Sequence, residues 1–149
     1  MRKLDVVLLI CVSLVGAPSA WAALGGNVAS IQADAALMNA SLRVDHTGKF
    51  SVYELQAPSG TVVREYMSPA GIVFAVSWEG PFLPDLRQLL GKYFERYTST
   101  VNVTHAGLNA RAVHHPDLVA RSSGHARAVH GKAFAPALAP LGVSIDDVQ

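Results

Sequence analysis

The sequence predicts an α+β fold: an antiparallel β-meander with one strongly amphipathic helix packed on it, an N-terminal helix and a second, C-terminal hairpin. Three observations predict it. Turn residues recur at short intervals between apolar segments from position 41 to 78. A stripe of apolar residues at helical spacing follows, from Leu86 to Tyr97. Two further strand-like segments then flank Ser123 and Gly124.

The first 22 residues have the pattern of a secretory signal peptide. Arg2 and Lys3 supply the positive end, and an apolar run covers 6–17. Ala20-Trp21-Ala22 matches the small-residue cleavage pattern, which predicts cleavage between Ala22 and Ala23. We therefore expect a periplasmic or secreted protein.

Two alternatives to a cleaved signal are less favoured by the residues. The apolar run 6–17 is shorter than the roughly 20 residues that cross a bilayer, so an uncleaved anchor fits poorly. Cys11 lies in the middle of this run and follows the bulky Ile10, which does not suit a lipid-attachment site. No later segment is long and apolar enough to span a membrane, so we expect no transmembrane segment in the mature chain.

Without these 22 residues the chain has 127 residues, 10 basic and 10 acidic side chains, and no cysteine, because Cys11 is the only one. This composition excludes a disulfide framework, a thiol nucleophile and sites built on cysteine ligands. The neutral balance argues against nucleic acid as a partner. The length fits one domain, 23–142, followed by a loosely held tail, 143–149.

The N-terminal helix is predicted over 28–39. Asn27 is a plausible N-cap, because its side-chain oxygen can accept from the first free backbone N–H groups. A thin apolar stripe at helical spacing follows it: Val28, Ile31, Ala35 and Met38.

Turns with glycine at 48, 60 and 71 leave room for four strands, near 41–45, 49–56, 61–68 and 72–78. Proline presets φ in the second and third turns, and glycine at their fourth position can take a positive φ. The strand 72–78 is apolar on both faces, which indicates a central place in the sheet. The strand 61–68 mixes charge into both faces and should lie nearer an edge or a groove.

The strongest helical signal follows Pro84, which suits a first helical turn. Its continuous apolar stripe predicts one helix across the sheet, with Leu89 and Phe94 as core anchors and Arg87 off the stripe. The residues 98–116 lack periodicity and are expected to form a strand fragment, 100–104, and a long connection. The second hairpin is expected over 117–134, turning at Ser123-Gly124.

No constellation of reactive residues is apparent. Five of the six histidines lie between 105 and 130, but none has the spacing of a metal-ligand motif. The chain has no G-x-S-x-G nucleophile motif and no phosphate-binding loop with its lysine. Glu54, Glu65 and Glu79 could pair as acid and base, but solvated carboxylates on a sheet face are commoner. We therefore expect no catalytic, cofactor-binding or metal-binding residues.

Arg64, Glu65 and Tyr66 are the candidate ligand or partner groove. They bring two charges and a phenol into an otherwise apolar strand. Adjacent strand residues point to opposite faces, so Arg64 and Tyr66 should share a face and Glu65 should lie on the other. A charge facing the cover of the sheet needs a partner or water, and an arginine is the partner expected for Glu65.

The residues 60–81 contain the stretch R-E-Y-x-S-P-x-G-x-V-F-A-V-x-W, and the similarity continues through 84–94. With the start Ala23-Leu24-Gly25-Gly26 and the later Ser123-Gly124-His125, the chain resembles the domain of unknown function 2844 family of exported proteobacterial proteins. The resemblance implies a leader-bearing, periplasmic protein with no established activity, substrate or cofactor. It carries over no catalytic residue.

These observations favour a non-enzymatic binding or envelope-associated module, with a protein or cell-envelope component as partner. The alternative is a small enzyme or ligand carrier that uses a groove around Arg64, Glu65 and Tyr66. A pocket lined by these three side chains, or a flat face in its place, would separate the two.

Overall fold

The computed structural model describes residues 23–99, 103–104 and 110–149. The predicted signal segment and Cys11 lie outside the described residues, as does part of the strand fragment predicted at 100–104.

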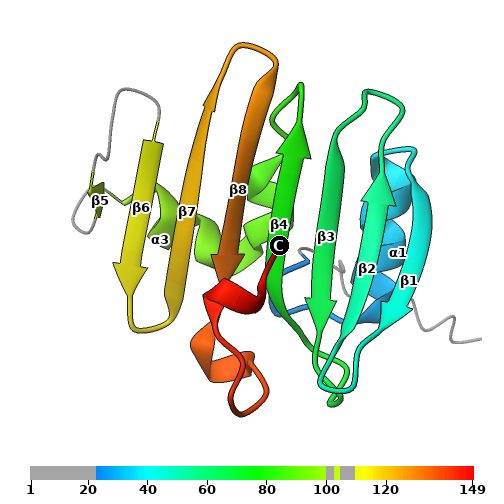
Figure 1. Ribbon diagram of the computed structural model, residues 1–149, viewed down its shortest axis with the longest axis vertical. Coiled ribbons are helices and arrows are strands. Elements are labelled where there is room, and N and C mark those ends of the chain that lie inside the picture. The colour runs from blue at the N-terminus through cyan, green and yellow to red at the C-terminus, as the bar shows by residue number, and fades with distance from the viewer. Residues whose placement is uncertain (1–22, 100–102, 105–109) are drawn as a thin grey trace, which may run out of the picture.

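The fold is α+β, with one antiparallel sheet in the strand order β1-β2-β3-β4-β8-β7-β6-β5. Two meanders form it, β1–β4 and β5–β8, and they meet where β4 pairs with β8 (Figure 1). The strands are β1 Ser41–His46, β2 Ser51–Gln56, β3 Val62–Met67, β4 Val73–Gly80, β5 Val103–Thr104, β6 Ala110–His115, β7 Leu118–His125 and β8 Ala128–Phe134.

The first meander lies close to the ranges predicted from its turn residues. Gly60 and Gly71 adopt φ of 90° and 79°, the left-handed conformation that glycine takes without steric cost. The N–H of Gly60 donates to the carbonyl of Ala57, and that of Gly71 to Ser68. β4 is buried over its first six residues and lies between β3 and β8, the central place that its apolar sequence indicates.

The helix α1 spans Val28–Leu37 on one side of the sheet (Figure 1). The Asn27 side chain caps it by accepting from the N–H groups of Ala29 and Ser30. Ile31 and Asp34 are buried on its inner side.

The helix predicted as one continuous element is broken into α2 Leu86–Leu90, a 3₁₀ turn Gly91–Tyr93 and α3 Phe94–Thr98. The break lies at Gly91, whose φ of 48° interrupts the right-handed helix. The helix also begins later than expected, with Asp85 as its N-cap.

The apolar stripe of this segment packs into the core, but Phe94 is a correction to the sequence prediction. Leu89 is 1% exposed, whereas Phe94 is only partly buried and packs at the margin of the core. The Arg87 guanidinium lies 4.5 Å from the centroid of the Phe94 ring. Phe94 therefore contacts a charged neighbour on its outer side and is not a fully enclosed anchor. The buried residues of the stripe are Leu86, Leu89, Leu90, Tyr93 and Tyr97.

The second meander differs most from its prediction. β7 continues through Ser123 and Gly124 to His125, and the two-residue turn is Ala126-Arg127. Arg127 takes φ of 63°, a conformation that a sequence reading assigns to glycine first. β6, which pairs with β7, was predicted as part of a connection. The sequence of β6 shows no alternation of apolar and polar residues, because polar side chains lie on both faces of the strand.

Each face of the sheet carries a core. The larger core lies between the sheet and the helices. The second core is on the opposite face, where Tyr66, Phe74 and Phe134 pack with Ile145 and Val148 of the C-terminal segment 143–149. The sequence indicated a loosely held tail there, yet Val148 is 1% exposed. The aromatic side chains of this second core form the surface on which the C-terminal segment packs.

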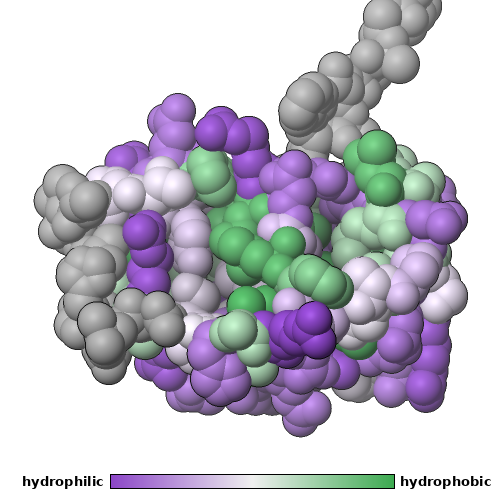
Figure 2. All heavy atoms as spheres, turned by 90° about the horizontal axis from the view of Figure 1, so that it is seen from above, coloured by the Kyte–Doolittle hydropathy of each residue, from purple (hydrophilic) through white to green (hydrophobic). Residues whose placement is uncertain are grey.

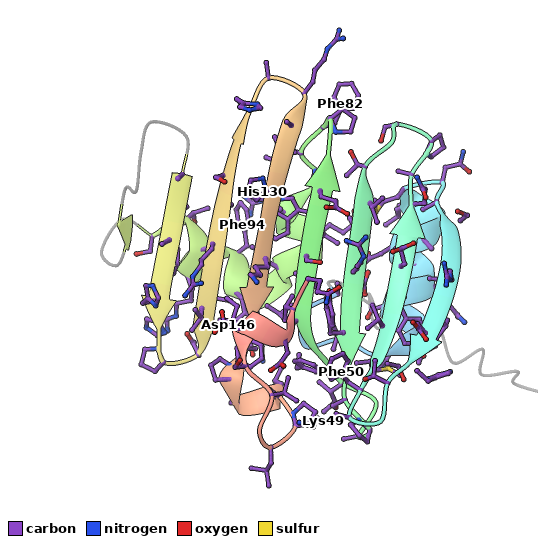
Figure 3. All side chains as sticks on the ribbon, in the orientation of Figure 1. Lys49, Phe50, Phe82, Phe94, His130 and Asp146 are labelled. Atoms are coloured by element: carbon purple, nitrogen blue, oxygen red, sulfur yellow. The ribbon has the colours of Figure 1, made fainter. Side chains whose placement is uncertain are left out.

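Apolar residues are also exposed at one end of the molecule. Figure 3 shows Phe82 beyond the upper end of β4, and Figure 2, which looks onto that end, shows hydrophobic surface at its centre. Phe82 and Leu83 are 59% and 58% exposed. Among the described residues, no helix has the length and apolar character needed to cross a membrane.

Candidate binding site

The sheet face opposite the helices is polar over its middle and upper part. Residues that alternate with the helix-facing core residues point to this open face. The strand registers place one row of them across neighbouring strands: Arg43, Glu54, Arg64, Ser77, Lys132, Arg121 and Ala112. Basic side chains predominate in this row.

Arg64 is held in the row by two carboxylates. Its Nε lies 2.9 Å from Oε2 of Glu54 on β2, and its Nη1 lies 2.9 Å from Oε1 of Glu79 on β4. The Arg64 side chain is 24% exposed, so the guanidinium still reaches solvent. The two carboxylates neutralise the charge of the Arg64 guanidinium and hold it in one position at the side of the site.

Beside Arg64 the open face is hollowed by a cavity of about 490 Å³. The cavity extends from β3 across β4, β8 and β7 to β6, and Gln149 of the C-terminal segment bounds it. Figure 3 shows His130 on β8 and Asp146 near the lower ends of β7 and β8. The charged and hydroxyl side chains that point from the open face into the cavity are Arg64, Ser77, Glu79, Arg121, Ser123, His130 and Lys132. Arg111 and Ser122 also border it, but their side chains contact Tyr97 on the helix-facing side of the sheet.

The basic residues of the cavity differ in how well they are neutralised. Lys132 donates from Nζ to the carbonyl oxygen of Val148 at 2.7 Å, which is a neutral acceptor. Arg121 lies 3.8 Å from the carboxylate of Asp146, whose side chain is 80% exposed. Exposed pairs at this distance interact weakly. Positive charge is therefore left over on β7 and β8.

The cavity also contains a hydroxyl–imidazole pair. Ser123 Oγ and His130 Nε2 lie 2.7 Å apart on paired positions of β7 and β8. The pair is exposed. It offers hydrogen-bonding groups beside the cations.

Tyr66 shares the open face with Arg64, as predicted from strand alternation, but the C-terminal segment covers it. Its hydroxyl donates to the main-chain oxygen of Gln149 at 2.8 Å and accepts from the Gln149 N–H at 3.0 Å. Ser77 Oγ donates to the same oxygen. The Tyr66 side chain is 2% exposed and thus fastens the segment that bounds the cavity.

Glu65 lies on the other face of the sheet, also as predicted, and is fully buried against the helices. The arginine expected as its partner is not there. Its neighbours are Asp34 on α1 and, through Asp34, the Gln88 amide on α2, which donates to Asp34 Oδ1. The structure thus brings two acidic groups together where the sequence indicated an ion pair.

The protonation of Glu65 follows from this environment. Burial, and after it the charge and hydrogen bonding of Asp34, raise the pKa of Glu65 from 4.5 to about 9. Burial likewise raises the pKa of Asp34. As two carboxylates, the pair would leave Asp34 Oδ2 and both Glu65 oxygens without donors among the described residues. A proton on Glu65 lets it donate to Asp34 and removes most of that cost.

The structure therefore separates Glu65 from Arg64 and Tyr66, and adds residues that sequence reasoning missed. Arg121, His130 and Lys132 lie in the segment predicted as the second hairpin, and the sequence did not single them out as site residues. A signal was present, because His130 and Lys132 alternate along one strand. Nothing local indicated that β8 pairs with β4 and so brings them beside Arg64.

Within the described ranges no three histidine, cysteine or acidic side chains gather as they would around a metal ion. Comparison with known proteins finds no matching curated protein and no matching solved structure. A family model does match, over residues 20–148, and its description is "Protein of unknown function (DUF2844)". Since the match covers most of the chain, this protein belongs to the DUF2844 family.

Proposed function

We propose that the protein is an exported, non-enzymatic binding module that holds an anionic group of a periplasmic or envelope component in the cavity on the open sheet face. The observation that carries the proposal is the lining of that cavity. Arg64, Arg121 and Lys132 contribute their side chains to it, and Glu79 is the one acidic side chain among its described lining residues.

The chemistry of these groups suits a carboxylate or phosphate. Arginine presents several N–H donors in a plane that matches either anion, and lysine adds a point charge. Arg121 and Lys132 occupy directly paired positions on β7 and β8, so both can reach one anion. Ser123 and His130 lie one row further along the same two strands and can donate to its remaining oxygens.

Rigidity of the site also supports binding. All of these side chains stand on strands in the interior of the sheet, and Arg64 is clamped between two carboxylates. A site held in place loses little conformational freedom when a ligand arrives. The small-enzyme alternative is less well supported, because Glu65 lies across the sheet from Arg64 and Tyr66.

A titration with inorganic phosphate, and separately with citrate, tests the proposal. Amide NMR shifts should concentrate on β7 and β8 and saturate. Lys132→Met and Arg121→Gln should each weaken binding by about tenfold, the size expected for one charge-assisted hydrogen bond. Lys92→Met, an exposed cation outside the cavity, is the matched control and should bind as the parent does. Shifts spread evenly over all exposed cations would refute the site.

Export is the second part of the proposal. The first described residues, Ala23 and Leu24, are buried, and the Leu24 N–H donates to the carbonyl of Leu89. The folded domain thus includes the residue that would follow cleavage after Ala22. The intact mass of protein isolated from the periplasm should correspond to a chain starting at Ala23. A species that retains Met1, or that carries lipid on Cys11, would contradict the prediction.

A further inference from the structure

The strand β1 is an edge of the sheet, and none of the described strands pairs with its outer side. Its six residues are all exposed. It pairs with β2 along its whole length without a bulge, and it contains no proline. Such strands present free backbone groups to another chain, and most proteins shorten, twist or cover them. The opposite edge, β5, spans only two residues.

The hydrogen-bond pattern of the β1–β2 hairpin shows which backbone groups of β1 are free. The N–H of Thr47 donates to the carbonyl of Phe50, so these two residues form a hydrogen-bonded pair. Bonded and non-bonded pairs alternate along an antiparallel ladder. Leu42, Val44 and His46 are therefore in non-bonded pairs with β2, and their N–H and C=O groups point outward.

The same alternation holds at the other end of the hairpin. It places the N–H of Ala57 toward β3, and that N–H donates to the carbonyl of Thr61. The assignment of inward and outward groups is thus consistent along β2 and carries over to β1.

Charge on β1 points to a particular partner, which is a second copy of the chain. An antiparallel pair of β1 strands centred on Val44 sets Val44 opposite Val44 of the second copy. The outward N–H and C=O groups of each strand then bond to those of the other strand. Arg43 then lies opposite Asp45 of the other copy, twice by symmetry. Neither Arg43 nor Asp45 makes an ion pair with any of the described residues of its own chain.

Neighbouring registers that also satisfy the backbone are disfavoured. A shift in one direction places Arg43 opposite its own copy, and a shift in the other places Asp45 opposite its own copy. Like charges directly opposite each other destabilise a strand pair. Of these registers, only the one centred on Val44 sets opposite charges directly across from each other, an arrangement that stabilises a strand pair.

Apolar residues of the edge strand are exposed as well. Leu42 and Val44 are each 40% exposed on the helix-facing side of β1. Pairing about a two-fold axis would bring these surfaces together with those of the second copy. We propose that the protein forms a symmetric dimer through antiparallel pairing of β1, centred on Val44. This proposal does not depend on the anion site.

Disulfide trapping tests the register directly. The chain from Ala23 onward contains no cysteine, so each variant of this mature chain carries a single introduced thiol. In the proposed dimer the two Val44 Cα atoms lie about 5.5 Å apart, which is within disulfide range. Val44→Cys should therefore give a covalent dimer on mild oxidation.

Leu42→Cys is the matched control, since Leu42 has the same strand, face and exposure as Val44. In the proposed register the two Leu42 positions are about four residues apart along the strands, roughly 13 Å, which is too far to bridge. Equal cross-linking of both variants, or none of either, would overturn the proposal.

Charge reversal gives an independent test by sedimentation or light scattering. Arg43→Asp alone and Asp45→Arg alone should each raise the dissociation constant of the dimer about tenfold or more, because each places like charges opposite each other twice. The double variant restores the opposite charges and should dimerise nearly as well as the parent. Circular dichroism confirms folding. A parent protein that stays monomeric at high concentration, or a double variant no better than the singles, would refute the pairing.

Discussion

Glu65 on β3 and Asp34 on α1 form a buried acidic pair whose exposed fractions are 0% and 1%. A buried acid ordinarily has a cationic partner, because an uncompensated charge in the core is very costly. This pair instead depends on a proton, held by Glu65, and on the Gln88 amide. The protonated pair therefore joins β3 to α1, and the Gln88 amide joins it to α2.

The first prediction is that stability falls as pH rises. The unfolded chain releases the Glu65 proton near pH 4.5, whereas the folded protein keeps it up to about pH 9. Between these values the unfolded state binds fewer protons, so the free energy of unfolding decreases with pH, by up to about 1.4 kcal/mol per unit from this group. The contribution is fully present below pH 4.5 and lost as pH approaches 9.

Thermal melts of Glu65→Gln measure the effect. The variant keeps the shape and can still donate to Asp34, so it should melt higher than the parent at pH 8 and close to it near pH 4. Glu95→Gln, which removes an exposed carboxylate on α3, should follow the parent at every pH. A parent and a Glu65→Gln variant with parallel pH curves would show that Glu65 is ionised in the fold.

The second prediction concerns α2 and α3. Leu89→Ala removes a side chain that is 1% exposed and should cost about 2–5 kcal/mol. Phe94→Ala should cost less, because Phe94 is only partly buried. Arg87→Ala loses the stacking on Phe94, worth about 0.5–1 kcal/mol at an exposed site. Urea denaturation of the three variants should give this order, and an equal cost for all three would mean that the segment is not packed on the sheet.

The third prediction concerns Gly131 on β8, over which the Trp78 ring lies. A Cβ added there would be 2.3 Å from Trp78 Cζ2 and 2.9 Å from the Cβ of Ser122. Gly131→Ala should therefore destabilise by about 1–3 kcal/mol or more, since ring and strand must move apart. Gly48→Ala is the control, because a Cβ there meets nothing within 4 Å. Similar melting temperatures for the two variants would contradict the packing of Trp78 against β8.

The fourth prediction concerns the C-terminal segment. Tyr66→Phe removes a hydroxyl that both donates to and accepts from the backbone of Gln149, at a cost of about 0.5–1.5 kcal/mol. Hydrogen exchange should quicken at Gln149 and its neighbours and stay unchanged in α1. Tyr53→Phe, on β2 and facing the helices, is the comparison. Unchanged exchange at Gln149 would mean that the segment is held by Ile145 and Val148 alone.

The sequence by itself determined the local structure of this protein, because local structure depends on neighbours along the chain. Glycine at 60 and 71 permits the positive φ of two turns, and strand alternation puts Arg64 and Tyr66 on one face and Glu65 on the other. Local signals were wrong where they were ambiguous. Gly124 resembles a turn residue, yet it lies in β7 and pairs with Val129, where a Cβ would approach the Ala128 carbonyl oxygen at 2.9 Å.

Tertiary structure alone decided which distant elements meet, and the candidate site depends on those meetings. Pairing of β4 with β8 brings Lys132 beside Ser77, and hence near Arg64, across about 55 intervening residues. The partner of Glu65 is Asp34 because α1 packs over β3. Periodicity along a chain predicts which residues point inward, but not which residues they will contact. Those contacts depend on how whole surfaces pack against each other.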